Sequence, residues 1–128
     1  MKILVTGHNG LIGTHLVKKL QSEFTVLTSS KNDDQSINVL DKSQLLDLER
    51  VDAVIHLAAK TSIANSISNP YDTYYTNMVG TLNILDYAVK KKLGMFSMLA
   101  LTFTVSLNIS LSMKIIRLDR IHHTIRVS

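Results

Sequence analysis

The chain has 128 residues and a formal net charge of +4, with 45% hydrophobic residues, 19% charged residues and no cysteine. This length and composition predict one globular domain with its own core and exclude a largely disordered chain. The lack of cysteine excludes disulfides and thiolate metal sites, and it favours a cytoplasmic location.

The positive charge is concentrated near the C-terminus. Residues 1–94 contain ten basic and nine acidic residues, whereas residues 95–128 contain four basic residues and one acidic residue. These basic residues are not interleaved with aromatic residues that could stack on bases. We therefore expect no nucleic-acid partner.

The first 27 residues predict a strand, a helix and a second strand. The apolar run Lys2–Thr6 stops at Gly7, as a buried parallel strand does. Apolar residues then recur at helical spacing over residues 11–20. Phe24–Leu27 predicts the second strand.

The same alternation continues to residue 92. Ile37–Leu40 predicts a short third strand, Ser43–Leu48 a short helix and Ala53–Ala58 a fourth strand. Pro70 suits the first turn of a long helix over Tyr71–Lys92. Strands that alternate with helices imply an α/β fold, with right-handed crossovers and a parallel sheet with flanking helices.

Three glycines mark the first turn as a candidate binding site. Gly7, Gly10 and Gly13 have the spacing G-x-x-G-x-x-G, directly after a strand and at the start of a helix. Such a turn lets backbone N–H groups approach a dinucleotide pyrophosphate at the positive end of the helix dipole. The alternative is a tight turn that binds nothing, but the flanking strand and helix favour binding.

Two later blocks carry a family resemblance. The motifs are T-G-x-x-G-x-x-G at Thr6–Gly13, H-L-A-A at His56–Ala59 and N-x-x-G-T at Asn77–Thr81. In order and spacing they resemble the NAD(P)-dependent epimerase/dehydratases, extended short-chain dehydrogenase/reductases that modify nucleotide sugars. The resemblance covers nearly all of residues 1–94. It implies a partial Rossmann fold with strands in the order 3-2-1-4, truncated after the fourth strand and its helix.

The resemblance also implies which residues bind the cofactor. The glycine turn would cradle the pyrophosphate, and the end of the fourth strand would line the path to the nicotinamide ribose. In chain order these residues are Gly7, Gly10, Leu11, Ile12 and Gly13, then Leu57, Ala58, Ala59 and Lys60. Asn77 would hydrogen-bond within the wall of the site, and Asn38 would accept a bond from the adenine amine in place of the usual Asp.

The end of the second predicted strand bears on the choice of cofactor, which is NAD or NADP. An NAD-preferring relative places a carboxylate there, on the ribose hydroxyls. This chain instead has Ser29 and Lys31, and a hydroxyl and a cation suit a 2′-phosphate, which slightly favours NADP. The alternative is a solvated polar loop.

The histidines are not expected to act chemically. His56 should be a packed residue at a strand end, because no further ligands lie at metal spacing, and we expect no metal site. His8 and His15 are expected at the surface.

Residues 95–128 lack the parts that catalysis in this family needs. They contain no Gly, Pro or Tyr, and Lys114 is their single lysine. The family's general acid/base is the Tyr of a Y-x-x-x-K pair, so that pair is absent. We therefore expect no catalytic residues, and an inactive NAD(P)-binding fragment of a nucleotide-sugar epimerase, dehydratase or reductase whose parent enzyme is a homodimer.

Three hypotheses explain this second segment. Residues 95–113 are uncharged and near membrane-spanning length, but seven Ser, Thr or Asn residues make a span unfavourable. The segment could be a divergent tail on a non-catalytic dinucleotide-binding module. Or it could be family sequence read one nucleotide out of frame. From Met95 onward, codons that encode these residues can be chosen so that the frame shifted by one base spells V-S-S, V-Y-G and Y-x-x-x-K in family order. We favour this last hypothesis, with residues 1–94 as the family domain and the apolar start of residues 95–128 lying against the open sheet edge.

Overall fold

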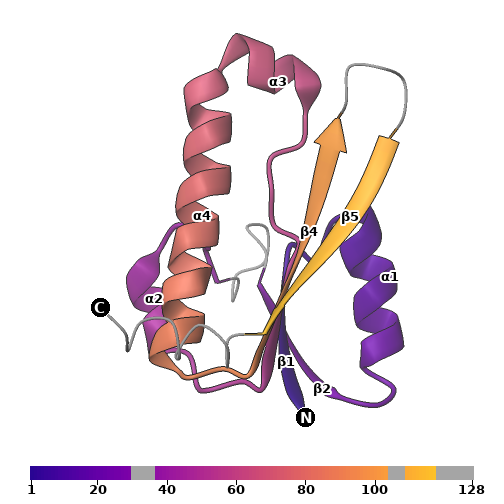
Figure 1. The fold of residues 1–128 in the computed structure, drawn as a ribbon, viewed down its shortest axis with the longest axis vertical. Coiled ribbons are helices and arrows are strands. Elements are labelled where there is room, and N and C mark those ends of the chain that lie inside the picture. The colour runs from indigo at the N-terminus through magenta and orange to yellow at the C-terminus, as the bar shows by residue number, and fades with distance from the viewer. Residues whose placement is uncertain (30–36, 104–108, 118–128) are drawn as a thin grey trace.

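The computed structural model describes residues 1–29, 37–103 and 109–117. Within them it has one sheet in the order β2-β1-β3-β4-β5, with helices on both faces (Figure 1). The strands are β1 (Lys2–Thr6), β2 (Thr25–Ser29), β3 (Ala53–His56), β4 (Met95–Phe103) and β5 (Ile109–Arg117). The helices are α1 (Leu11–Leu20), α2 (Lys42–Asp47), α3 (Ile63–Ser68) and α4 (Pro70–Lys90).

The three strands β2, β1 and β3 run parallel and build two core layers. Side chains alternate across β1, so Ile3 and Val5 face one layer with Val17 of α1, whereas Leu4 faces the other. The second layer includes Ile84 of α4 and is the larger one. In Figure 1, α1 covers one face of the sheet, and α2 and α4 cover the other. The predicted α/β class, parallel sheet and flanking helices are confirmed.

Helix α4 has strong local signals at its start. The Asn69 side chain accepts from the backbone N–H of Asp72 at 3.2 Å, and Pro70 occupies the first turn. Its buried face includes Tyr87, whose hydroxyl donates to the carbonyl oxygen of Glu49 at 2.7 Å. The cap and the buried face explain why the prediction of this long helix is correct to within two residues at each end.

The predicted third strand at Ile37–Leu40 is wrong. The Asn38 side-chain oxygen accepts from the Leu40 N–H at 3.0 Å, and the Asn38 carbonyl accepts from the Asp41 N–H at 2.9 Å. The carbonyls of Val39 and Leu40 accept from the Asn83 side chain. The segment therefore uses its backbone groups in a local turn and against α4 instead of in a sheet ladder.

The start of the second segment joins the sheet. Strand β4 pairs in parallel with β3, with Ala53 opposite Met95, and β5 returns antiparallel to β4. This agrees with the expected position of the apolar start at the open edge of the sheet. Residues 95–103, which belong to the segment 95–113 considered as a membrane span, form strand β4. No helix in the described part of the chain is long and apolar enough to cross a membrane.

Candidate functional site

The candidate site lies where the order of the parallel strands reverses. The chain leaves β1 for β2 on one side and later returns to β3 on the other side of β1. The crevice outside the carboxyl ends of β1 and β3 is the usual ligand site of an open α/β sheet. A cavity of about 600 Å³ lies there, beside a second of about 240 Å³.

The glycine turn closes tightly against the end of β3. Gly7 has φ +73°, a conformation that glycine adopts readily, and a Cβ there would lie 2.6 Å from the Ala58 nitrogen. Its carbonyl accepts from the Gly10 N–H at 3.1 Å. A Cβ on Gly13 would lie 2.4 Å from the Gly7 carbonyl oxygen. At Gly7 and Gly13, therefore, any side chain would clash with neighbouring backbone atoms.

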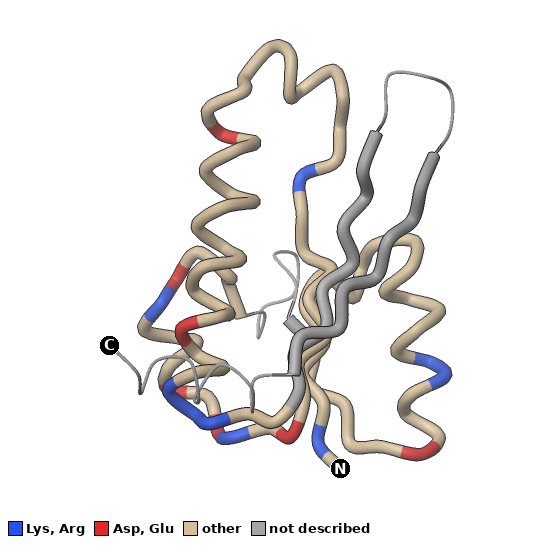
Figure 2. The backbone as a smooth tube through the Cα atoms, viewed as in Figure 1, with Lys and Arg blue, Asp and Glu red and all other residues tan. Residues whose placement is uncertain are grey.

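The N-terminus of α1 faces this turn. Its cap residue is Gly10, which makes no side-chain cap, and the Thr14 N–H makes the first intrahelical bond to the Gly10 carbonyl at 3.0 Å. The N–H groups of Leu11, Ile12 and Gly13 precede that bond and have no intrahelical acceptor. Figure 2 shows basic residues gathered at the other end of the molecule, near the last turn of α4. Among the described residues, the features of this turn that suit an anion are therefore its backbone N–H groups and the helix dipole.

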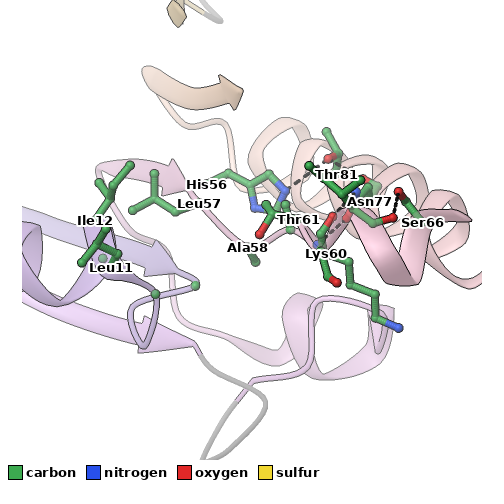
Figure 3. Close-up of a pocket in the computed structure, with 16 residues that line it drawn as sticks. Leu11, Ile12, His56, Leu57, Ala58, Lys60, Thr61, Ser66, Asn77 and Thr81 are labelled. Atoms are coloured by element: carbon green, nitrogen blue, oxygen red, sulfur yellow. Dashed lines mark hydrogen bonds between the residues drawn. The ribbon is translucent and has the colours of Figure 1, made fainter. Parts of the chain in front are cut away.

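The opposite wall is held by Asn77 of α4. Its side-chain oxygen accepts from the Lys60 N–H at 2.7 Å, and its side-chain nitrogen donates to the Lys60 carbonyl at 3.1 Å. The Lys60 ammonium is ion-paired with Asp72. Figure 3 shows the Lys60 side chain extending away from Leu11 and Ile12 across the cavity. The backbone of Lys60 therefore lines the cavity, while its charge is turned toward α4.

His56 is buried between the two walls, with 3% of its surface exposed. Its Nδ1 lies 2.7 Å from the Thr6 hydroxyl and its Nε2 lies 3.2 Å from the Thr81 hydroxyl. Burial lowers the pKa of His56 to about 4, so the ring is neutral near pH 7. Its packed position at a strand end agrees with the prediction.

The smaller cavity includes the predicted adenine contact. Asn38 lines it with Val39, Ala58 and Thr76. The Asn38 side-chain oxygen already accepts the Leu40 N–H, but a carbonyl oxygen has a second lone pair. Acceptance of one further hydrogen bond is chemically compatible with this position.

The two cavities bring together most of the residues predicted to bind the cofactor. Of that set, the residues that line one or both cavities are Gly7, Gly10, Leu11, Ile12, Gly13, Asn38, Leu57, Ala58, Ala59, Lys60 and Asn77. Lys31 lies outside the described residues, and Ser29 is described only as the backbone end of β2.

Sequence reasoning missed the part of the cavity that surrounds α3. Thr61, Ser62, Ile63 and Ser66 line the larger cavity, and no helix was predicted there. The available signal was Ser62, whose hydroxyl accepts from the Asn65 N–H as an N-terminal cap. The roles of Thr6 and Thr81 as partners of His56 were also missed, because they depend on β1 and α4 packing beside the end of β3.

Comparison with known proteins agrees with this geometry. The model of the NAD dependent epimerase/dehydratase family matches residues 3–104. A putative UDP-glucose 4-epimerase of Methanocaldococcus jannaschii is 34% identical over an alignment of 99 positions, which covers 66% of this chain and 32% of that protein. A GDP-6-deoxy-D-talose 4-dehydrogenase of Aggregatibacter actinomycetemcomitans is 36% identical over an alignment of 88 positions, which covers 66% of this chain and 29% of that protein. The chain thus spans about a third of the length of these curated relatives.

Solved structures agree as well. UDP-glucose 4-epimerase of Thermus thermophilus in complex with NAD aligns with a TM-score of 0.67 and 25% identity, covering 75% of this chain and 36% of that one. The dTDP-glucose 4,6-dehydratase DesIV of Streptomyces venezuelae, with NAD bound, aligns with a TM-score of 0.63 and 29% identity, covering 75% and 38% of the two chains.

Proposed function

The chain belongs to the NAD-dependent epimerase/dehydratase family, and from that membership we propose that residues 1–94 bind a nicotinamide dinucleotide in the crevice between β1 and β3. The observation that supports this most strongly is the glycine turn packed on the end of β3, where an added Cβ at Gly7 or Gly13 would clash. Backbone N–H groups at the start of α1 can approach a diphosphate closely at such a turn.

The remaining cavity residues have complementary roles in this proposal. The Leu57–Ala59 backbone lines the path from the pyrophosphate to the nicotinamide ribose, and Asn38 accepts from the adenine amine. Asn77 fixes the turn at Lys60 and does not need to touch the cofactor. When bound, the nicotinamide would supply a hydride acceptor for a sugar carbon, the reaction shared by the family.

We expect Gly10→Ala to weaken dinucleotide binding at least tenfold, because a methyl group would project beside the pyrophosphate position. The fold should tolerate this change, since the new Cβ would contact only the Gly7 carbonyl oxygen, at 3.3 Å. Calorimetry with NAD⁺ and NADP⁺ on wild type and variant measures the effect. Gly94→Ala is the matched control, because a Cβ at Gly94 meets no atom within 4 Å.

The same titrations test cofactor choice. Ser29 and Lys31 support a preference for NADP, through a hydroxyl and a cation at the 2′-phosphate. Tighter binding of NADP⁺ than of NAD⁺ would agree with this proposal, and the reverse order would contradict it. Equal loss of binding for both cofactors in the Gly10 variant is expected, because both carry the same pyrophosphate.

We also propose that the parent activity is epimerisation, dehydration or reduction of a nucleotide sugar, and that this chain does not catalyse it. Residues 95–128 contain no tyrosine and therefore no Y-x-x-x-K pair. Purified protein with NAD⁺ or NADP⁺ and UDP-glucose, GDP-mannose or dTDP-glucose is expected to show no change in nicotinamide absorbance and no new sugar product. Turnover that depends on added cofactor would contradict this.

A shifted reading frame remains our proposed origin of residues 95–128. Its support is that residues 95–128 contain no Gly, Pro or Tyr, and that codons permitted for these residues, read one base later, can spell V-S-S and Y-x-x-x-K in family order. The family match itself continues to residue 104, ten residues past the proposed boundary. Sequencing the gene across codons 93–95 and beyond codon 128 tests the proposal. An open shifted frame that encodes V-S-S and Y-x-x-x-K supports it, and early stop codons in that frame would contradict it.

Helix α4 supports the proposed homodimer of the parent enzyme. One stripe of the helix exposes large apolar side chains at helical spacing, namely Tyr71, Tyr74, Tyr75, Met78 and Leu82. The rings of Tyr71 and Tyr75 stack with centroids 5.9 Å apart. Such a stripe can pair with its own copy across a two-fold axis, which would remove these side chains from water.

A further inference from the structure

A chain of hydrogen bonds passes through His56 and joins three segments of the cavity wall. The Ala58 N–H lies 3.3 Å from the Thr6 hydroxyl oxygen, which in turn lies 2.7 Å from His56 Nδ1. On the other side of the ring, His56 Nε2 lies 3.2 Å from the Thr81 hydroxyl oxygen, which lies 2.7 Å from the Asn77 carbonyl oxygen. The segments joined are the end of β1, the turn after β3 and helix α4.

The direction of these bonds follows from donor and acceptor chemistry. A carbonyl oxygen can only accept, so the Thr81 hydroxyl donates its hydrogen to Asn77. The Thr81 oxygen must then accept from His56 Nε2–H. A neutral imidazole with a proton on Nε2 has an acceptor at Nδ1, so the Thr6 hydroxyl donates there and its oxygen accepts from the Ala58 N–H.

Burial supports the neutral form of the ring. His56 is 3% exposed and Thr6 is fully buried, and this burial lowers the pKa of His56. With a neutral ring near pH 7, each of these four hydrogen bonds has one donor and one acceptor.

We propose that His56 is a positioning residue, fixed as the Nε2–H tautomer, that holds the glycine turn, the Leu57–Lys60 turn and α4 at the spacing that dinucleotide binding requires. This inference rests on the proposed dinucleotide function. His56 and Thr81 line the larger cavity, and Asn77, the end of the chain of bonds, also clamps Lys60 through its side chain. A break at Thr81 would release His56 from α4, while the Asn77 side chain would keep its two bonds to the Lys60 backbone.

The first test reads the tautomer directly and needs no cofactor. Nitrogen-15 NMR of the ring at pH 7, with the His56 signals assigned by their loss in His56→Gln, should show a protonated Nε2 and an unprotonated Nδ1. A proton on Nδ1 would overturn the proposal even if the protein binds NAD⁺ well.

The second test measures the effect on binding. Thr81→Val removes the acceptor with little change of shape, and Thr81→Ser retains it. If the wall then adopts the competent arrangement about a tenth of the time, the apparent Kd for NAD⁺ rises about tenfold in the Val variant. The Ser variant should return to within about twofold of wild type, because it keeps the hydroxyl.

The outcomes separate the two proposals. Equal NAD⁺ affinity of wild type and a folded Thr81→Val would overturn the positioning role, as would weak binding that serine does not rescue. A wild-type protein with the Nε2–H tautomer that binds neither NAD⁺ nor NADP⁺ would contradict the dinucleotide function, and with it the purpose assigned to His56. If the Val variant does not fold, NAD⁺ binding by Thr6→Ser and Thr6→Val decides the same question at the other side of the ring.

Discussion

Gly13→Ala is expected to abolish dinucleotide binding and to lower the free energy of unfolding by about 3 kcal/mol, the upper part of the range for overpacking. The new Cβ would lie 2.4 Å from the Gly7 carbonyl oxygen and 2.6 Å from the His8 Cα. Both neighbours are backbone atoms of the turn, so no side chain can rotate away. The helix would have to move off the turn, which carries the N–H groups away from the phosphate position.

Urea unfolding and NAD⁺ calorimetry on the same preparations measure the two effects. Gly94→Ala makes the identical chemical change where the added Cβ meets nothing within 4 Å, and it should alter stability by less than about 1 kcal/mol. Similar destabilisation by both substitutions would mean that the close contact at Gly13 does not determine the result. Unchanged NAD⁺ affinity in a stable Gly13→Ala variant would show that cofactor binding does not require this geometry of the glycine turn.

The parts of the fold that sequence predicted well are those with signals from neighbouring residues. Residues 11–20 form α1 with the predicted bounds, because apolar periodicity begins directly after the glycine turn. The order β2-β1-β3 is the part of the Rossmann strand order that the family resemblance implied. The glycine spacing likewise placed the turn correctly, since its constraint is local backbone geometry.

The errors arose where side chains compete with backbone pairing. An apolar pattern at Ile37–Leu40 predicted a strand, but Asn38 and the distant Asn83 take the hydrogen bonds that a ladder would use. Helix α3 was missed because it is a short helix without a buried residue and thus gives no apolar periodicity. His56 was placed correctly, yet its partners Thr6 and Thr81 lie 50 and 25 residues away in the sequence. Only the tertiary arrangement makes that set visible.

Stability should fall as the pH is lowered from 6.5 to 4, by about 3 kcal/mol in total, because of His56. Its pKa is about 4 in the folded protein, against an ordinary value of 6.5 in the unfolded chain. Between these values the unfolded chain binds a proton that the folded protein does not, so acid favours unfolding. A hydrogen bond from Ser43 lowers the pKa of Asp41, and a hydrogen bond from Lys42 lowers the pKa of Asp86, so the contributions of both carboxylates are lost at lower pH, outside this window.

Urea unfolding of wild type and His56→Gln at several pH values between 4.5 and 7.5 measures this dependence. The difference between the two profiles removes the contributions of the four other histidines, which are present in both proteins. Near pH 7 the variant should be the less stable protein, because it disturbs the bonds to Thr6 and Thr81. Its disadvantage should shrink by about 1.4 kcal/mol per pH unit toward pH 4.5, because only wild type buries a group that acid protonates. A difference that stays constant across this range would show that His56 accepts a proton as readily in the folded protein as in the unfolded chain, which is incompatible with a neutral ring held between two hydroxyls.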